Sequence, residues 1–195
     1  MKHLFPALAL AAAFATPATG EPGMRLAPEV AGLVRGLICA PPEGDRREAP
    51  DTAAGWIHVP AAPIEILQEG FTAPALLGTA FGVRYILEGT ILEGAGAPLP
   101  VRYTVGHPPL PPAGTTQQSW DSFVLPGTPE QVFFQFDIEE ELQPGRWSFA
   151  AHSGTRELVH VACDVVAPDT VPHLTGLCRG ANLLAVSRTS HGGSG

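Results

Sequence analysis

Residues 144–166 read PGRWSFAAHSGTRELVHVACDVV and carry the clearest local pattern in the chain. After the Pro-Gly pair, Trp147 and Phe149 alternate with smaller or polar residues, which is the period of two of a half-buried strand. Ser153-Gly154 supplies a turn, because glycine tolerates positive φ and lets a hairpin close. Residues 158–166 then return as a second strand. The stretch therefore predicts an antiparallel β-hairpin.

Alternating apolar and polar residues also occur upstream of this hairpin. The segments with this pattern are 81–87, 101–105, 120–124 and 132–136, with shorter candidates at 56–59 and 64–67. Glycine and proline together make up 22 + 21 of the 195 residues, and they punctuate the apolar runs. Short strands separated by such turns, without a long amphipathic helix, predict an all-β fold built as a single antiparallel sandwich.

Residues 27–39 fit two periodicities. Their apolar positions match a helical face, and Pro28 suits the first turn of a helix. Gly32 and Gly36 each cost a helix about 1 kcal/mol relative to alanine, so we predict a strand.

The remaining segments are read as connections. Polar and proline-rich composition predicts loops at 40–54 and 106–118, and the acidic run 137–141 reads as a solvated connection. The expected β-sandwich domain covers 24–186. We expect the tail 187–195, which has almost no apolar content, to be disordered.

The N-terminus has the pattern of a secretory signal. Lys2 precedes an apolar run of about 7–15 residues, and small residues follow it. We expect residues 1–20 to be a signal peptide, with cleavage after Ala15 or after Gly20. No later apolar stretch approaches the roughly 20 residues that a membrane span needs. The sequence thus predicts a periplasmic or secreted protein.

An oxidising compartment allows one disulfide among the three cysteines. Cys39 and Cys178 both lie at expected element ends, whereas Cys163 alternates with valines on a predicted strand. We favour a Cys39–Cys178 bridge with Cys163 as a buried free thiol, although sequence alone leaves the pairing open. Closing so long a loop stabilises a fold by roughly 3–5 kcal/mol in the chain-entropy model.

Charge and composition exclude several functions. The formal net charge is −8, and Lys2 is the only lysine. Nucleic-acid binding needs clustered basic residues, so we expect no nucleic-acid partner. A Schiff-base or P-loop lysine is absent from the body of the chain.

Motifs for catalysis, metal binding or cofactor binding are also missing, and we predict no catalytic, metal-ligating or cofactor-binding residues. There is no paired Cys or His at zinc spacing and no Gly-x-Ser-x-Gly elbow. A site could still assemble from dispersed groups, such as His107 with the 137–141 acids, or His152 with His160. Trp56, Trp120 and Trp147 fit core positions better than a carbohydrate platform.

Five segments resemble a family of small secreted bacterial proteins whose domain has no assigned function. They are Gly36–Cys39, Phe81–Tyr85, Val105–Pro109, Glu141–Phe149 and Val171–Cys178. The resemblance covers about residues 30–185 and implies an immunoglobulin-like sandwich in the cell envelope, without catalytic residues to carry over. The Cys39–Cys178 separation departs from the inter-sheet disulfide of antibody domains.

Taken with this resemblance, the sequence predicts a non-catalytic immunoglobulin-like module that binds a protein or envelope partner. The alternative is a periplasmic metal-binding protein or hydrolase whose site assembles from dispersed His and Asp/Glu. A third hypothesis is a structural subunit that pairs through an exposed edge strand.

Overall fold

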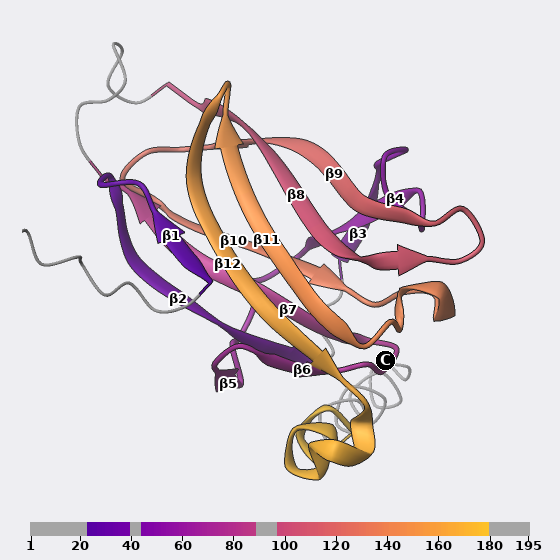
Figure 1. The fold of residues 1–195 in the computed structure, drawn as a ribbon. Helices are drawn as coiled ribbons and strands as arrows, with labels where there is room; N and C mark the ends of the chain where they lie inside the picture. The colour runs from indigo at the N-terminus through magenta and orange to yellow at the C-terminus, as the bar shows by residue number, and fades with distance from the viewer. Residues whose placement is uncertain (1–22, 40–43, 89–96, 180–195) are drawn as a thin grey trace, which may run out of the picture.

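Backbone ladders organise the described residues, 23–39, 44–88 and 97–179 of a computed structural model, into two main sheets and a separate ribbon (Figure 1). The larger sheet has the order β1 (Met24–Leu26), β12 (Arg156–Val166), β11 (Gly145–Ser153), β8 (Leu99–Leu110) and β9 (Thr115–Val124). The smaller has the order β10 (Pro129–Gln135), β7 (Thr79–Leu87), β2 (Val30–Cys39) and β5 (Gln68–Glu69). The ribbon pairs β3 (Gly44–Glu48) with β4 (Trp56–Pro60).

The strand order is that of an immunoglobulin domain. Such domains place strands A, B and E in one sheet and strands C, F and G in the other, with C′ added beside C in the variable type. Here β2, β7 and β10 correspond to A, B and E, and β8, β9, β11 and β12 to C, C′, F and G. The predicted all-β, antiparallel immunoglobulin-like sandwich is therefore confirmed. One short pair is parallel: β6 (Thr72–Pro74) runs alongside β12.

The hairpin of residues 144–166 supplies the centre of the core. Strands β11 and β12 pair antiparallel, and Gly154 has a φ of 57° at the turn. Trp147 and Phe149 are fully buried, as the alternation predicts. The Trp147 ring lies 5.3–6.0 Å from the centroids of three phenylalanine rings, those of Phe81 and Phe134 in the smaller sheet and of Phe136 just after β10. This aromatic cluster joins the two sheets.

The ambiguous segment 27–39 forms the strand β2, as predicted. A Cβ on Gly36 would collide with the carbonyl of Gln68, so this glycine permits the close approach of β5. Gly36, one of the two glycines that disfavour a helix here, is thus required by the sheet.

The predicted loop at 106–118 is wrong. Strand β8 continues to Leu110 and β9 begins at Thr115, so only a short turn separates them. The pairing register shifts between Gly106 and Leu110, around Pro108 and Pro109. Prolines cannot donate to a ladder, so they interrupt the pairing without ending the strand.

Two other expectations need correction. The predicted loop 40–54 contains strand β3, and residues 64–67 precede β5 without being a strand themselves. Ile64 is nevertheless buried, in a small cluster with Ile38 and Ala80. Residues 40–43 lie outside the described residues.

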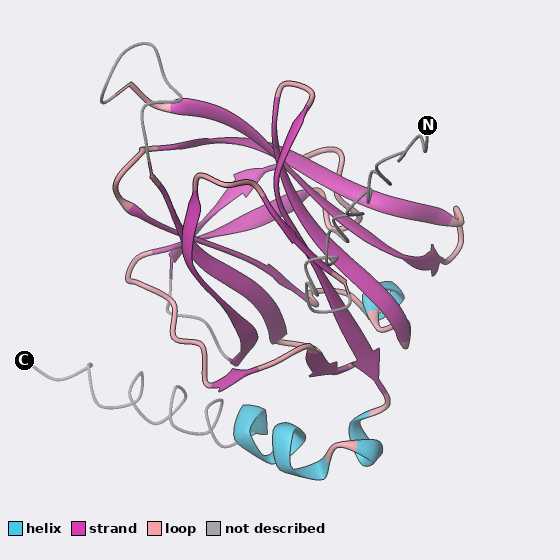
Figure 2. Cartoon of the chain, turned by 60° about the vertical axis from the view of Figure 1, so that its left-hand side comes forward, coloured by secondary structure: helices cyan, strands magenta, loops and turns pink. Residues whose placement is uncertain are grey.

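A helical segment follows β12 and was not anticipated. The 3₁₀ turn η2 (Pro168–Thr170) leads into helical residues 172–179, beyond the ends of the strands (Figure 2). Cys178 on this segment forms a disulfide with Cys39 at the end of β2. The bridge therefore fastens the C-terminal helical segment to the point where the chain leaves the smaller sheet.

Several expectations concern residues outside the described ranges. These are the signal peptide 1–20 with its cleavage sites after Ala15 or Gly20, the disordered tail 187–195, and the boundary at residue 186. Among the described residues, none of the helices has the length and apolar character required to cross a bilayer.

Candidate functional site: the cleft beneath the arm

The ribbon β3–β4 is an addition to the immunoglobulin scheme. It lies between β2 and β7 in the sequence, where a simple sandwich needs only a short connection. We call residues 44–60 the arm. Figure 1 shows the arm on the β9 side of the molecule, away from β1. Because functional sites are often carried by segments added to a rigid scaffold, the arm is the first place to look for one.

The arm is a hairpin that contacts the core through few apolar side chains, the buried Ala49 and the partly buried Ile57. Every residue of β3 is exposed. The turn is held by Thr52, whose hydroxyl donates to the carbonyl of Ala49 at 2.8 Å, and by Gly55, which has a φ of 79°. The Arg46 guanidinium lies 3.6 Å from the centre of the Trp56 ring, which is half-buried and lies 4.9 Å from the His58 ring.

Polar contacts fasten the arm across the open side of the sandwich, between the edge strands β9 and β10. Arg47 donates to the carbonyl of Asp121 at 2.9 Å, and the amide of Ser119 donates to the carbonyl of Asp51 at 3.1 Å. The β9 edge is therefore partly paired by the arm. Next to the arm, the amide of Ile64 donates to the Gln131 side chain on β10 at 2.9 Å.

Two neighbouring hollows remain beneath the arm. The inner cleft has a volume of about 190 Å³, and its walls come from β4, β9 and β10, with Tyr103 of β8 at its base. The outer hollow has a volume of about 300 Å³ and lies between the arm, Arg102 and Asp121. Arg47 and Trp120 line both hollows, so the two adjoin.

A line of three hydrogen-bonding side chains runs from the core into the inner cleft. The Tyr103 hydroxyl donates to Glu130 Oε1 at 3.1 Å, and the Tyr85 hydroxyl lies 3.1 Å from that of Tyr103. Burial raises the pKa of both tyrosines, so both remain neutral donors. Burial also raises the pKa of Glu130, although the hydrogen bond from Tyr103 opposes this.

A second polar network crosses the sandwich end near the arm. Glu141 in the 3₁₀ turn η1 (Glu139–Glu141) accepts from the amide of Asp137 at 2.9 Å and from Gln118 at 3.3 Å. Gln118 in turn accepts from the amide of Ala53 in the arm at 2.6 Å. Asp137 accepts from Gln135 at 2.8 Å and lies 2.9 Å from His58 Nε2.

The predicted solvated connection at 137–141 is therefore wrong for two of its acids. Glu141 is only 1% exposed, and the Asp137 side chain is 11% exposed. Burial raises the pKa of Glu141, and the hydrogen bond from the Asp137 amide acts in the opposite direction. Two buried donors need an acceptor at this place, and the Glu141 carboxylate provides both of its oxygens.

The dispersed sites considered from the sequence assemble differently. His107 contacts the Pro108 carbonyl and the Trp147 ring, and no described interaction joins it to the 137–141 acids. His58, which sequence reasoning did not single out, contacts Asp137 instead. His152 and His160 share a carboxylate, at 3.8 and 3.5 Å from Glu157.

Across the described residues, no group of three or more His, Cys, Asp or Glu side chains is arranged to hold a metal ion. Arg25 already binds the Glu157 carboxylate through two hydrogen bonds of 2.8 and 3.0 Å. Cys163 is free and buried, and burial raises the pKa of its thiol to about 12. The thiol therefore stays protonated at neutral pH and is a poor nucleophile.

The tryptophans divide between core and arm. Trp147 is fully buried and Trp120 is 7% exposed, as expected for core residues, and Trp120 also forms part of the cleft wall.

A sequence signal for the cleft did exist. Tyr85 and Tyr103 occupy inward positions on predicted strands, and a buried tyrosine hydroxyl needs a polar partner.

Known proteins similar to this chain are found among solved structures. No family model matches the chain, and no curated protein matches it. Among solved structures, the chain is similar to an immunoglobulin-like protein from Pseudomonas aeruginosa. The two are 20% identical with a TM-score of 0.46, and the match covers 73% of this chain and 96% of the other.

Proposed function

We propose that the protein is a non-catalytic immunoglobulin-like module that binds a protein or cell-envelope partner outside the cytoplasm, through the arm and the hollows beneath it. The observation that carries this proposal is the arm itself. It is an exposed ribbon added to the sandwich, and it forms a charged and partly aromatic cleft against the scaffold. Apolar clefts with a few convergent polar groups are the usual form of a binding site.

The surroundings of the histidines favour binding over catalysis. The His58–Asp137 pair is neighboured by the Gln135 amide and by the rings of Trp56 and Phe133, at 4.9 and 6.1 Å between centroids. These neighbours support a positioning role for His58 at the base of the arm. A hydrolase would need a nucleophile within hydrogen-bond reach of such a base.

A periplasmic or secreted location fits this function. The Cys39–Cys178 disulfide is compatible with an oxidising compartment, where such bonds form and persist. The N-terminal signal pattern supports the same location. An envelope protein that lacks its own catalytic chemistry would act by holding a partner.

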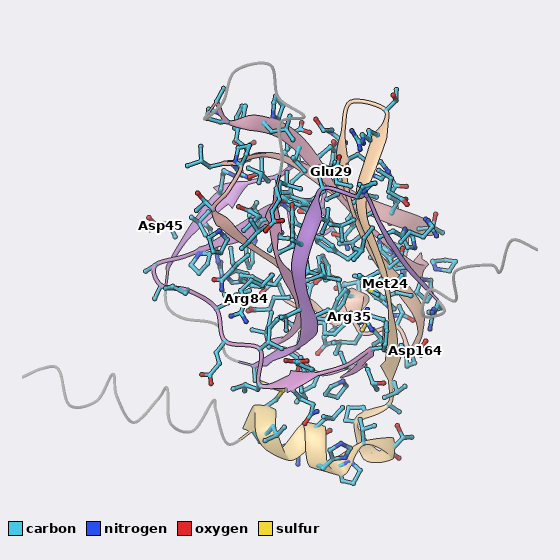
Figure 3. The ribbon with its side chains drawn as sticks, turned by 90° about the vertical axis from the view of Figure 1, so that its left-hand side faces the viewer. Met24, Glu29, Arg35, Asp45, Arg84 and Asp164 are labelled. Carbon is cyan, nitrogen blue, oxygen red and sulfur yellow. A yellow bond between two sulfur atoms is a disulfide. The ribbon has the colours of Figure 1, made fainter. Side chains whose placement is uncertain are left out.

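The test is site-specific photo-crosslinking in the native cell envelope. A photoreactive residue replaces Asp45, on the exposed strand of the arm, and a matched control replaces Asp164 on β12. Figure 3 shows these two aspartates on opposite flanks of the molecule. We expect a discrete adduct, identified by mass spectrometry, from position 45 and not from position 164. Adducts from both positions alike, or from position 164 alone, would contradict a partner at the arm.

A further inference from the structure

We propose that the inner cleft takes a basic side chain of the partner, with the Glu130 carboxylate as counter-ion for its ammonium or guanidinium group. This inference rests on the proposed function and names the chemistry of its partner. The geometry behind it is a carboxylate in a cleft that accepts a hydrogen bond from the neutral Tyr103 hydroxyl, which is itself hydrogen-bonded to the Tyr85 hydroxyl.

The first argument is the unmet charge of Glu130. Glu130 is half-buried, and pairing with a cation offsets the cost of removing part of a carboxylate from water. The only hydrogen bond that Glu130 makes among the described residues comes from the Tyr103 hydroxyl, and none of the described ion pairs includes it. A cation from outside would complete the arrangement.

The nearby arginines are engaged elsewhere. Arg102 binds Asp51 at 2.8 Å and Asp121 at 3.1 Å, on the outer hollow. Arg47 donates to the main-chain carbonyl of Asp121. Arg47 also lines the inner cleft, but no hydrogen bond or ion pair joins it to Glu130 among the described residues. Glu130 therefore lacks a partner from its own cleft walls.

The two tyrosine hydroxyls support the same conclusion. Tyr103 has a single O–H proton and donates it to Glu130, so the Tyr85 hydroxyl must donate to the Tyr103 oxygen. Both O–H dipoles are then directed at the carboxylate. This arrangement supports a negative charge on Glu130 and leaves its other oxygen, Oε2, without a hydrogen bond among the described residues.

The shape and walls of the cleft fit a side chain. Its volume of about 190 Å³ is below the roughly 300–1,000 Å³ of pockets that hold whole small ligands. Ile57, Val132 and the rings of Trp120 and Phe133 line it. The methylene stem of a lysine or arginine can pack on such apolar walls while its charged end reaches the carboxylate. Aromatic faces also attract cations directly.

Net charge favours the same partner. The chain carries 19 acidic residues against 11 basic ones. Charge complementarity of this kind steers a basic partner toward an acidic surface and accelerates the encounter.

The test uses the full processed chain with its disulfide intact, titrated with Nα-acetyl-lysine methylamide. The neutral control probe is Nα-acetyl-norleucine methylamide, which keeps the apolar stem and lacks the charge. We expect saturable NMR shifts at the amides of residues 130–133 with the lysine probe, and at least tenfold weaker binding of the norleucine probe. Equal binding of the two probes would overturn the proposal.

Two variants locate the effect. Glu130→Gln should weaken binding of the lysine probe at least tenfold, whereas Glu69→Gln, the same change on exposed β5, should leave it unchanged. Undiminished binding to a folded Glu130→Gln protein would overturn the proposal. If that variant fails to fold, the comparison of the two probes on the unaltered protein still tests whether the cleft prefers a cation.

The two proposals can fail separately. Arm-specific crosslinks without preference for the lysine probe would overturn the cation site and leave the binding module standing. Preference for the lysine probe that depends on Glu130, without arm-specific crosslinks, would support the cation site and contradict the partner at the arm.

Discussion

The two sides of the sandwich bury very different side chains. Around Trp147, at the centre, the neighbours are aromatic and the packing is apolar. Toward the arm, the buried groups include the Glu141 carboxylate, the Gln118 amide and the Tyr103 hydroxyl. Apolar burial is favourable by about 25 cal/mol per Å², whereas a buried hydrogen bond contributes only about 0.5–1.5 kcal/mol after desolvation. The first side holds the fold together, and the second holds the arm in place and shapes a cleft.

The largest effect is expected from the apolar side. Trp147→Ala should lower the free energy of unfolding by about 3–5 kcal/mol, because it empties the centre of the aromatic cluster. It also removes the hydrogen bond from the indole to the Gln143 carbonyl, at 2.8 Å. The measurement is urea unfolding followed by circular dichroism.

Trp56→Ala is the control for this comparison. Trp56 is half-buried and packs between Arg46 and the His58 ring, away from the aromatic cluster, so its removal should cost only about 1 kcal/mol. If the two tryptophan variants were equally destabilised, the arm would be part of the cooperative core, and the distinction between the two sides would fail.

An intermediate effect is expected from the buried carboxylate on the arm side. Glu141→Ala leaves the Asp137 amide and the Gln118 side chain without their acceptor, which should cost about 1–3 kcal/mol. Glu140→Ala, in the same 3₁₀ turn but exposed, should change the unfolding free energy by less than about 0.5 kcal/mol. Thermal unfolding of both variants decides. Equal values would show that the network around Glu141 contributes nothing to stability.

The same contrast explains which parts of the structure the sequence predicts. Where strands are half-buried, as in 81–87 and the hairpin 144–166, the alternation of apolar residues reports directly which side chains face the core. The large aromatic side chains of β7 and β11 follow that pattern, whereas small neighbours such as Ala80 and Ala150 are buried as well. The disulfide could be favoured for a related reason. Cys39 and Cys178 lie at predicted element ends, whereas Cys163 lies within an alternating strand.

The arm is predicted only in part: the alternation at 56–59 predicts β4, but no pattern predicts β3. All five residues of β3 are exposed, so the strand exists only through its ladder with β4, and backbone hydrogen bonds impose no pattern on side chains. Glu141 cannot be told from Glu139 and Glu140 by composition, because its burial follows from donors that other elements bring to it. Glu130 lies opposite Tyr85 in the β10–β7 register, but Tyr103 reaches it from the other sheet. Contacts of that kind depend on how the sheets are packed.

The smallest change in stability is expected for Glu130→Gln, which also tests the cleft most directly. Unlike the other substitutions, it should raise the free energy of unfolding. Burial raises the pKa of Glu130 above the 4.5 of an ordinary glutamate, so the folded protein holds this proton more tightly than the unfolded chain does. The stabilisation from the neutral acid is fully present below about pH 4.5, and it is lost as the pH rises through the pKa of the folded protein. At neutral pH the charged carboxylate therefore lowers stability.

Glu130→Gln should consequently match the unaltered protein near pH 4 and exceed it at pH 7, by about 0.5 kcal/mol. The amide oxygen of glutamine can still accept the hydrogen bond from Tyr103, so the gain comes from removing the charge. Urea unfolding across this pH range measures the difference, with Glu69→Gln as the exposed control. A variant that is less stable at pH 7 would mean that the carboxylate is already compensated within the chain. No uncompensated charge would then be left in the cleft for a basic partner to neutralise. A carboxylate kept for binding at the expense of stability must lower the stability of the unbound protein.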